Sequence, residues 1–204
     1  MSWKVSDSKI RQFLSDQARL DDYLQSICTP AEIGLFYERY IGYLYESDGY
    51  RVEYSGIKNG FDDLGRDLIA RKGNDVLVIQ CKRWSKSKII HEKHIYQLFG
   101  TSTHMQFEKK RKVCPVFVTS GSLSHEAQAA AKDLGVKLRF IPLNRKYPMV
   151  KCNINHLGKL YHLPFGKWYD SVQINTRAGD YFVSSIEEAL KLGFSSAYLY
   201  KRSA

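Results

Sequence analysis

The chain has 204 residues, of which 44% are hydrophobic and 13% aromatic, so it can bury the core of one domain of ordinary size together with a small appendage. Its longest apolar runs, such as Val76 to Ile79, suit a strand and not a membrane-spanning helix of roughly 20 residues, and its polar N-terminus lacks the apolar stretch of a signal peptide; we therefore expect a cytoplasmic protein that does not enter a membrane. The formal net charge of +10 favours a polyanionic partner, with a generally basic soluble protein as the alternative.

Two helices are predicted at the start of the chain. Apolar residues recur three and four positions apart between residues 8 and 27, which predicts an amphipathic helix. A second helix begins at Pro30, because Thr29 is a suitable N-cap and Glu32 completes a capping box. This helix is expected to run to about Ser47.

A β-hairpin is predicted after these helices. A short piece of alternating apolar residues at 50–54 precedes a loop rich in Gly and Asp at 55–65. Segments 67–71 and 75–82 then flank Lys72-Gly73-Asn74, a sequence typical of a tight turn between two strands.

The elements that follow alternate between helix and strand. They are a helix at 92–105, a buried strand at 113–119, an alanine-rich helix that ends at Gly135 and a strand at 136–141. The order α-α-β-β-β-α-β-α-β predicts an α/β fold in which helices flank a mixed β-sheet.

Three polar side chains are predicted to converge at the hairpin. Side chains alternate along a strand, so Gln80 and Lys82 share one face while Cys81 points to the opposite, apolar face. The hairpin brings Asp67, at the start of its own strand, close to both. Asp67 alone could be a turn residue, and Gln80 and Lys82 could line a solvated face. Because Gln80 follows four consecutive apolar residues, we favour a functional site.

A carboxylate, an amide oxygen and an ammonium group together suit phosphodiester hydrolysis. Hard oxygen ligands hold Mg²⁺, for which Mn²⁺ would substitute, and the ion polarises the phosphate and lowers the pKa of a bound water. A lysine beside the ion can orient that water or stabilise developing charge. Glu38, at the edge of the apolar face of the second helix, is the best candidate for a second carboxylate, although it could simply be solvated. We expect Asp67, Glu38 and Gln80 to be metal ligands and Lys82 to be catalytic.

Five segments between residues 30 and 141 resemble the motifs of one family. They are, in chain order, Gly34 to Glu38, Gly65-Arg66-Asp67, Gln80-Cys81-Lys82, Ile95 to Gly100 and Val118 to Ala131. Together they resemble the Mrr-type restriction endonucleases, a branch of the PD-(D/E)xK nucleases with Q-x-K in place of E-x-K. Leu123 departs from the pattern, since an aromatic residue is usual there.

This resemblance implies a restriction-endonuclease-like fold, a mixed β-sheet flanked by helices. It implies metal-dependent cleavage of DNA, often of modified or foreign DNA. It also adds Gln97, on the helix after the hairpin, to the catalytic residues, which are then Glu38, Asp67, Gln80, Lys82 and Gln97.

Basic and aromatic residues that follow the catalytic strand are the expected DNA contacts. They are Arg83, Trp84, Lys86 and Lys88. A solvated charge run explains them nearly as well. His91 and His94 could touch phosphate, but surface histidines are the simpler interpretation, and Lys109 to Lys112 are expected to form an exposed turn.

The pattern changes around residues 142–148. We therefore assign residues 1–145 to the nuclease domain with its N-terminal helix, and residues 152–204 to a small α+β accessory module. That module resembles one appended to nucleases and DNA-repair proteins, on the residues Tyr161-His162-Leu163-Pro164, Tyr181-Phe182 and Glu187 to Phe194.

Cysteines argue against a metal in that module and against disulfides in the chain. Related modules hold a metal through cysteines, whereas here only Cys152 is nearby and Phe165-Gly166 stands where a cysteine is expected. The four cysteines are scattered, without a C-x-x-C pair, which predicts reduced thiols. We expect His162 to pack within the module more than to touch DNA.

We thus expect a Mg²⁺-dependent DNA endonuclease active in restriction or in defence against foreign or modified DNA. Cutting both strands with one site per chain favours a homodimer. Two alternatives stay open: a structure-selective nuclease resembling Holliday-junction resolvases, and a non-catalytic DNA-binding protein, since the neutral Gln80 weakens the hold on a metal by one charge.

Overall fold

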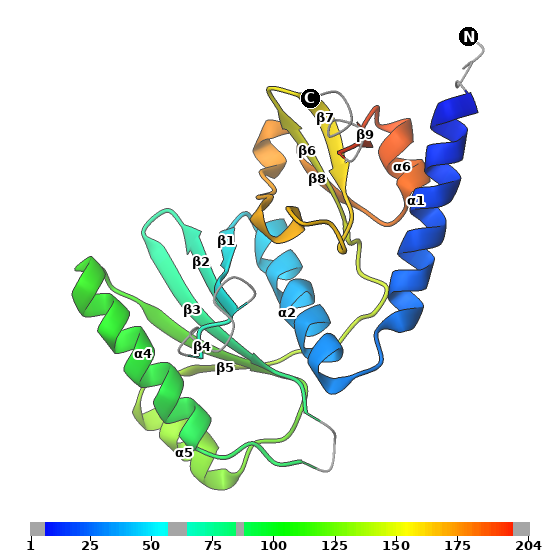
Figure 1. Ribbon diagram of the computed structural model, residues 1–204. Coiled ribbons are helices and arrows are strands. Elements are labelled where there is room, and N and C mark those ends of the chain that lie inside the picture. The colour runs from blue at the N-terminus through cyan, green and yellow to red at the C-terminus, as the bar shows by residue number, and fades with distance from the viewer. Residues whose placement is uncertain (1–6, 57–64, 85–87, 198–204) are drawn as a thin grey trace. The chain divides into compact units, whose positions relative to one another are not determined.

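The chain folds into two compact units, shown in a computed structural model (Figure 1). The structure describes residues 7–56, 65–84 and 88–197. One unit spans Thr29–Arg145, and the other combines Met1–Cys28 with Lys146–Ala204. Most of the loop predicted at 55–65 lies outside the described residues, as does the predicted DNA contact Lys86. Within the described ranges, every helix is too short or too polar to cross a membrane.

A five-stranded mixed sheet forms the middle of the first unit (Figure 1). Its strands, in spatial order, are β1 (Arg51–Tyr54), β2 (Leu68–Lys72), β3 (Asp75–Lys82), β4 (Cys114–Thr119) and β5 (Lys137–Phe140). The first three strands are antiparallel and the last two parallel to β3. The predicted hairpin is confirmed, with Lys72 opposite Asp75 at its turn and Leu68 opposite Ile79 at its open end.

Helices cover this sheet in the predicted order. The helices are α2 (Pro30–Ser47), α4 (Lys93–Lys109) and α5 (His125–Asp133). The capping box of α2 is confirmed: the Glu32 backbone N–H donates to the Thr29 hydroxyl, and the Thr29 backbone N–H donates to the Glu32 carboxylate. Helix α4 runs one turn beyond the predicted end at residue 105, because Met105 is buried in the core and the helix continues past it.

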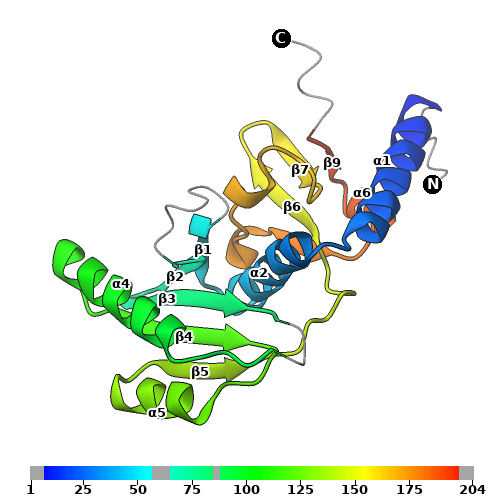
Figure 2. The ribbon, with the colours of Figure 1, turned by 60° about the horizontal axis from the view of Figure 1, so that its bottom comes forward.

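Helices α4 and α5 lie beside the sheet (Figure 2), and a hydrophobic core fills the space between them and the strands. Ile69 of β2 and Val76 and Val78 of β3 belong to this core, together with Ile95 and Leu98 of α4. Because side chains alternate along a strand, residues 67, 80 and 82, which are two or four positions away from Ile69 and Val78, lie on the same face of the sheet. The polar side chains of the site thus face the helix that carries residue 97.

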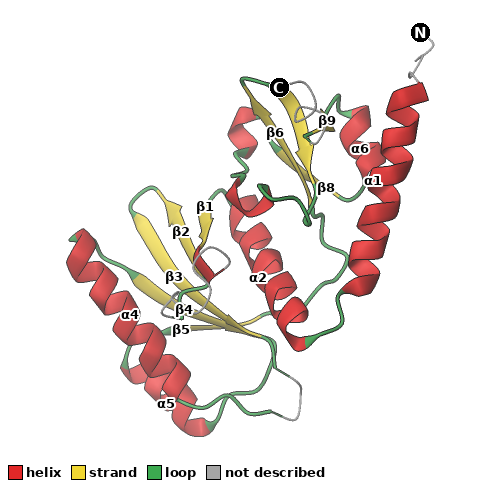
Figure 3. Ribbon diagram, in the orientation of Figure 1, coloured by secondary structure: helices red, strands yellow, loops and turns green. Residues whose placement is uncertain are grey.

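The second unit is a small sheet packed with helices (Figure 3). Its strands, in spatial order, are β8 (Tyr181–Val183), β6 (Val150–Asn155), β7 (Gly158–His162) and β9 (Ser195–Ser196). Its helices are α1 (Asp7–Ser26), α6 (Ile186–Lys191) and the short 3-10 turns η2 (Tyr169–Ser171) and η3 (Thr176–Ala178).

Helix α1 belongs to this second unit, whereas we expected it in the domain at residues 1–145. The fully buried carboxylate of Asp16 accepts hydrogen bonds from the Tyr161 hydroxyl, at 2.7 Å, and from the Ser196 hydroxyl, at 3.1 Å. The ring of Tyr23 also packs against that of Phe165, with centroids 5.9 Å apart. Periodicity predicts a helix but does not tell which sheet it covers, because these partners lie far along the chain.

A buried lysine and a partly buried histidine lie in the interior of the second unit. Lys151 has no exposed side-chain surface; its ammonium donates to the Val172 carbonyl at 2.9 Å and lies over the Tyr169 ring. His162 shares a 2.9 Å hydrogen bond with Asn153, so it packs within the unit as we expected. Burial, and then the charge of Lys151, lower the pKa of His162 to about 4.

Replacing Asp16 with alanine should strongly destabilise the second unit. The change leaves the buried hydroxyls of Tyr161 and Ser196 without their acceptor, which costs about 2–4 kcal/mol of unfolding free energy. Denaturant unfolding of the full chain measures the loss. Asp22→Ala, an exposed change on the same helix, is the control, and equal losses in the two variants would contradict the anchoring role.

Acid should destabilise the second unit through His162. Its folded-state pKa of about 4 lies below the ordinary 6.5, so between these values the unfolded chain binds a proton that the folded chain does not. Stability contributed by the neutral imidazole is therefore complete above pH 6.5 and falls as the pH drops toward 4. His162→Gln keeps a donor for Asn153 but does not titrate, and its thermal midpoint should fall less over this range than that of the unsubstituted chain.

Candidate active site

Asp67 is held against β3 by two hydrogen bonds. Its backbone N–H donates to the Ile79 carbonyl at 3.0 Å, and its side-chain Oδ2 accepts from the Cys81 backbone N–H at 2.6 Å. Asp67 is 7% exposed, so the carboxylate is almost buried. The position of this side chain is thus determined by backbone groups of the strand that carries Gln80 and Lys82.

Gln80 and Gln97 lie together over Gly65. Gly65 has a φ of +73°, and a Cβ added there would lie 2.9 Å from the Gln97 amide and 3.0 Å from Gln80 Nε2. Gln80 comes from β3 and Gln97 from α4, so the bare glycine backbone leaves the space in which the two amides meet. Gln80 is 1% exposed, and its Oε1 is buried without a hydrogen-bond partner in the described part of the chain.

Glu38 and Lys82 lie close enough to act on the same buried thiol. Burial raises the pKa of Cys81 well above its ordinary value, and the negative charges of Asp67 and Glu38 raise it further, while Lys82 opposes them. Glu38 is on α2 and the other groups are on or beside β3. Two carboxylates and one ammonium group therefore surround the middle residue of the Gln80-Cys81-Lys82 segment.

One pocket of about 780 Å³ takes in all five residues proposed as catalytic. Its lining includes Glu38, Asp67, Gln80, Lys82 and Gln97, and also Gly34, Gly65, Arg83 and Trp84. Gly34 lies one helical turn before Glu38, and nothing lies within 4 Å of where its Cβ would be, so this side of α2 is open.

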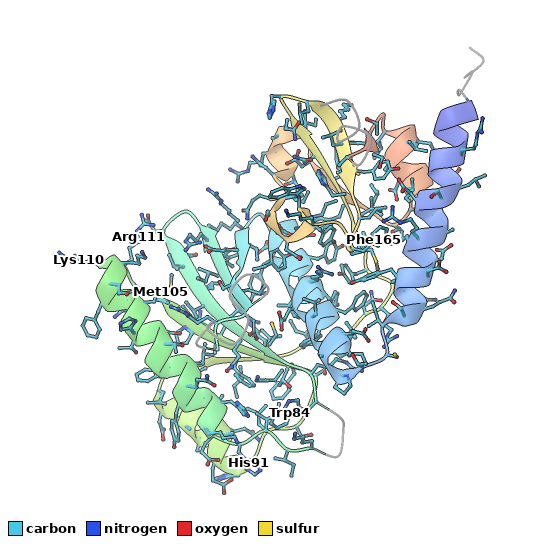
Figure 4. All side chains as sticks on the ribbon, viewed as in Figure 1. Trp84, His91, Met105, Lys110, Arg111 and Phe165 are labelled. Carbon is cyan, nitrogen blue, oxygen red and sulfur yellow. The ribbon has the colours of Figure 1, made fainter. Side chains whose placement is uncertain are left out.

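Trp84 sits at the pocket within a small aromatic and basic cluster (Figure 4). The Lys88 ammonium lies 4.2 Å from the centroid of its ring, and the His94 ring meets it edge-on at 5.2 Å. Burial, and then the positive charges of Lys82 and Lys93, lower the pKa of His94 to about 4, so its imidazole is neutral at physiological pH.

Sequence reasoning missed two features of this site. We treated Gly65 only as part of a motif, although its lack of a side chain leaves room for the amides of Gln80 and Gln97. We interpreted His94 as a surface residue, whereas its Nε2 is buried and its ring packs on Trp84. The spacing of His94 and Gln97, three residues apart on one helix, is the signal that could have placed His94 beside the site.

The donors in the pocket suit a hard cation more than zinc. Among the described residues, no three His, Cys, Asp or Glu side chains are grouped to hold a metal ion. What the pocket offers is two carboxylates, from Glu38 and Asp67, and the unpartnered amide oxygen of Gln80. Oxygen donors of this kind are those that Mg²⁺ prefers.

Comparison with known proteins agrees with this architecture. The Mrr-type family model described as "Restriction endonuclease" matches residues 33–144, which is more than half of the chain. No curated protein sequence matches it.

Three solved structures are similar to parts of this chain. The apo form of EndoMS is 18% identical with a TM-score of 0.33, over 38% of this chain and 32% of its own. MspJI in complex with a 27-mer oligonucleotide is 15% identical with a TM-score of 0.39, over 69% of this chain and 33% of its own. AF1548, a protein of unknown function, is 20% identical with a TM-score of 0.38, over 50% of this chain and 55% of its own. This chain thus spans a third to about half of the length of these proteins.

The family match covers most of α2, the hairpin, the five residues proposed as catalytic and both later helices of the first unit, and the sheet has the mixed, helix-flanked form that the motifs implied. The chain belongs to the Mrr-type restriction endonuclease family.

Proposed function

We propose that this chain is a magnesium-dependent endonuclease that hydrolyses phosphodiester bonds of DNA. The observation that carries the proposal is the Oε1 atom of Gln80, which is buried without a hydrogen-bond partner in the described structure, in the same pocket as two carboxylates. A buried polar atom without a partner is unfavourable by about 1–3 kcal/mol. A bound cation would give this atom its missing partner.

Asp67, Glu38 and Gln80 are the residues that would hold Mg²⁺, and Mn²⁺ would substitute. The two carboxylates supply charge, and the amide supplies a neutral oxygen. When bound, the ion would polarise the scissile phosphate and lower the pKa of an attacking water. The hydrogen bond from the Cys81 backbone N–H fixes the Asp67 carboxylate at the end of β3, beside Gln80 and Lys82.

Lys82 is the residue that would assist the attack. Its side chain follows Gln80 on the same face of β3 and lines the same pocket, where its ammonium can orient a water or stabilise charge on the phosphate. Cys81 and His94 would not compete for these roles. The raised pKa of the Cys81 thiol keeps it protonated, and the lowered pKa of His94 keeps it neutral.

Arg83, Trp84 and Lys88 would contact the DNA beside the scissile phosphate, with Lys86 in the same segment. Arg83 and Trp84 line the pocket and Lys88 lies on the Trp84 ring, so charge and aromatic surface adjoin the carboxylates.

We propose a role in restriction or in defence against foreign or modified DNA, in the cytoplasm; the match to a restriction endonuclease family is what supports restriction. One pocket per chain would cut one strand, so cleavage of a duplex on both strands favours a homodimer. The Holliday-junction-resolvase-like alternative differs in substrate and not in chemistry.

Asp67→Asn should abolish cleavage while leaving the fold intact. Asparagine keeps an oxygen to accept from the Cys81 N–H but removes one of the two negative charges, so nicking of supercoiled plasmid with Mg²⁺ should fall at least about a hundredfold. Asp133→Asn, an exposed change on α5, should cut normally. Retained DNA binding by Asp67→Asn, measured in EDTA, separates loss of chemistry from loss of affinity.

Cleavage by the unsubstituted chain decides between the candidate functions. Nicking that is insensitive to EDTA would overturn the metal mechanism. Absence of cleavage with every divalent ion, on methylated and unmethylated plasmid alike, would instead support the non-catalytic DNA-binding protein. A four-way junction cut much faster than linear duplex would support the resolvase-like enzyme.

Gly65→Ala should reduce cleavage much more than Gly73→Ala. Both glycines have positive φ, +73° and +58°, so alanine strains the backbone by about 1 kcal/mol at either position. Only at Gly65 would the new Cβ press on Gln80 and Gln97, whereas Gly73 has open space around it. We expect similar losses of stability, and a roughly ten- to hundredfold loss of cleavage for Gly65→Ala alone. Equal cleavage by the two variants would show that the space at Gly65 is not needed to position the amides of Gln80 and Gln97.

A further inference from the structure

A second basic surface lies at the other end of the first unit from the pocket. We call it the distal basic surface, and it consists of Lys109, Lys110, Arg111, Lys112, Lys137 and Arg139. These exposed residues come from the end of α4, the turn after it, and β5. They line three hollows of about 710, 250 and 470 Å³, with Lys112 shared between the first and the third and Arg111 between the second and the third.

None of the six cations of this surface forms an ion pair with an acidic side chain of the described chain, although the carboxylates of Asp48 and Asp75 also line the first hollow. Neighbouring cations are paired: Arg71 with Glu53 at 3.2 Å, and Lys72 with Asp48 at 3.5 Å. Like charges gathered without partners destabilise a compact fold. Such a cluster is expected where the missing partner is a bound polyanion.

Lys110 is held in a conformation that lysine disfavours. It ends α4 with a φ of 49°, and among the described residues it is the one non-glycine residue with a positive φ. Glycine is the usual residue at such a helix end, because a side chain strains the left-handed conformation. A lysine that keeps this strain points to a use for its charge. Phe107, 75% exposed, lines the same hollow as Lys110.

The distance between this surface and the pocket is determined by one rigid helix. Gln97 lies near the start of α4 and Lys110 just past its end, so the helix separates them by about 20 Å at 1.5 Å per residue. Figure 4 shows Trp84 and His91 at one end of this helix and Lys110 and Arg111 at the other. This separation corresponds to roughly six base pairs of duplex.

We propose that the distal basic surface binds the phosphate backbone of DNA at a position remote from the scissile bond. The inference deepens the proposed function, since it gives the enzyme a second grip on its substrate. The phosphates come either from a remote stretch of the duplex in the pocket or from a second duplex. Exposed lysine and arginine without protein partners are the groups that release counterions from a phosphate backbone.

The variant K110Q/R111Q/K112Q tests the proposal through the salt dependence of binding. Each phosphate contact contributes about 0.9 to the slope of log affinity against log salt, so the slope should fall by as much as about 2.7. Affinity for a duplex of about 30 base pairs should fall roughly tenfold or more at low salt. Binding is measured in EDTA, so the result does not depend on cleavage.

The matched control R11Q/K167Q/R177Q removes the same charge from exposed residues of the second unit. The proposal requires the slope of log affinity against log salt to fall clearly more in the distal variant than in this control. Equal decreases in slope would mean that only the net charge matters, and they would overturn the proposal. The unsubstituted chain could cut no DNA while the salt slope still falls more in the distal variant than in the control. The nuclease proposal would then fail, and the proposal that the distal basic surface binds DNA would be retained.

Duplex length identifies the source of the phosphates. A hairpin duplex of about five base pairs is only about 17 Å long, so one that occupies the pocket cannot also reach the distal surface. If the same duplex supplies both contacts, the distal variant should bind this short duplex as the unsubstituted chain does. If a second duplex binds, the variant should show the loss on short duplexes too, with one fewer duplex bound per chain.

Lys110→Gly separates function from stability. Glycine removes the left-handed strain, so the melting temperature should stay the same or rise, while the salt slope should fall by about 0.9. A structural role for Lys110 predicts the opposite change in melting temperature. An unchanged salt slope in this variant would place Lys110 outside the DNA contact.

Discussion

The hydrogen bond from the Cys81 backbone N–H to the Asp67 carboxylate is the contact on which the site depends. The ladder between β2 and β3 reaches Leu68 and Ile79, and Asp67 adds one more backbone bond to Ile79. At Cys81, however, the acceptor is a side-chain carboxylate and not a backbone carbonyl. The two strands can therefore separate here without leaving a buried N–H unsatisfied. The pocket opens where the ladder ends, and its acidic group is also the group that closes the ladder.

Neither Cys81 nor His94 adds a charge at the pocket. Burial and two nearby carboxylates keep the Cys81 thiol protonated, so the residue between Gln80 and Lys82 adds no negative charge. Burial and nearby lysines keep His94 neutral, so it adds no positive charge beside Lys82. A neutral amide among the donors lowers the electrostatic attraction for a cation by one charge relative to a third carboxylate. In the proposed metal site, the placement of Gln80 beside Gly65 and Gln97 would have to compensate for this weaker attraction.

Local rules predicted most of the first unit, and long-range packing decided the rest. Strand alternation was enough to put Asp67, Gln80 and Lys82 on one face, and the capping box was enough to begin α2 at Pro30. Helix α1 was assigned to the wrong unit, because the partners of Asp16 are 145 and 180 residues further along the chain. The close approach of Gly65, Gln80 and Gln97 brings together three separate segments of the chain. No pattern within a single segment could therefore predict it.

Both basic regions of the first unit are attached to the same two rigid elements. Strand β3 has Lys82 at the pocket end and Asp75 in a hollow of the distal basic surface, and α4 likewise runs from Gln97 to Lys109. Because a helix and a central strand do not stretch, a phosphate contact at one end restricts where a phosphate can lie at the other. We therefore expect the proposed nuclease to respond to the length and path of its substrate as well as to the bond that it cuts. In this proposal the lysines of the distal basic surface and the strained helix end contribute to substrate selection, at a place remote from the carboxylates of the pocket.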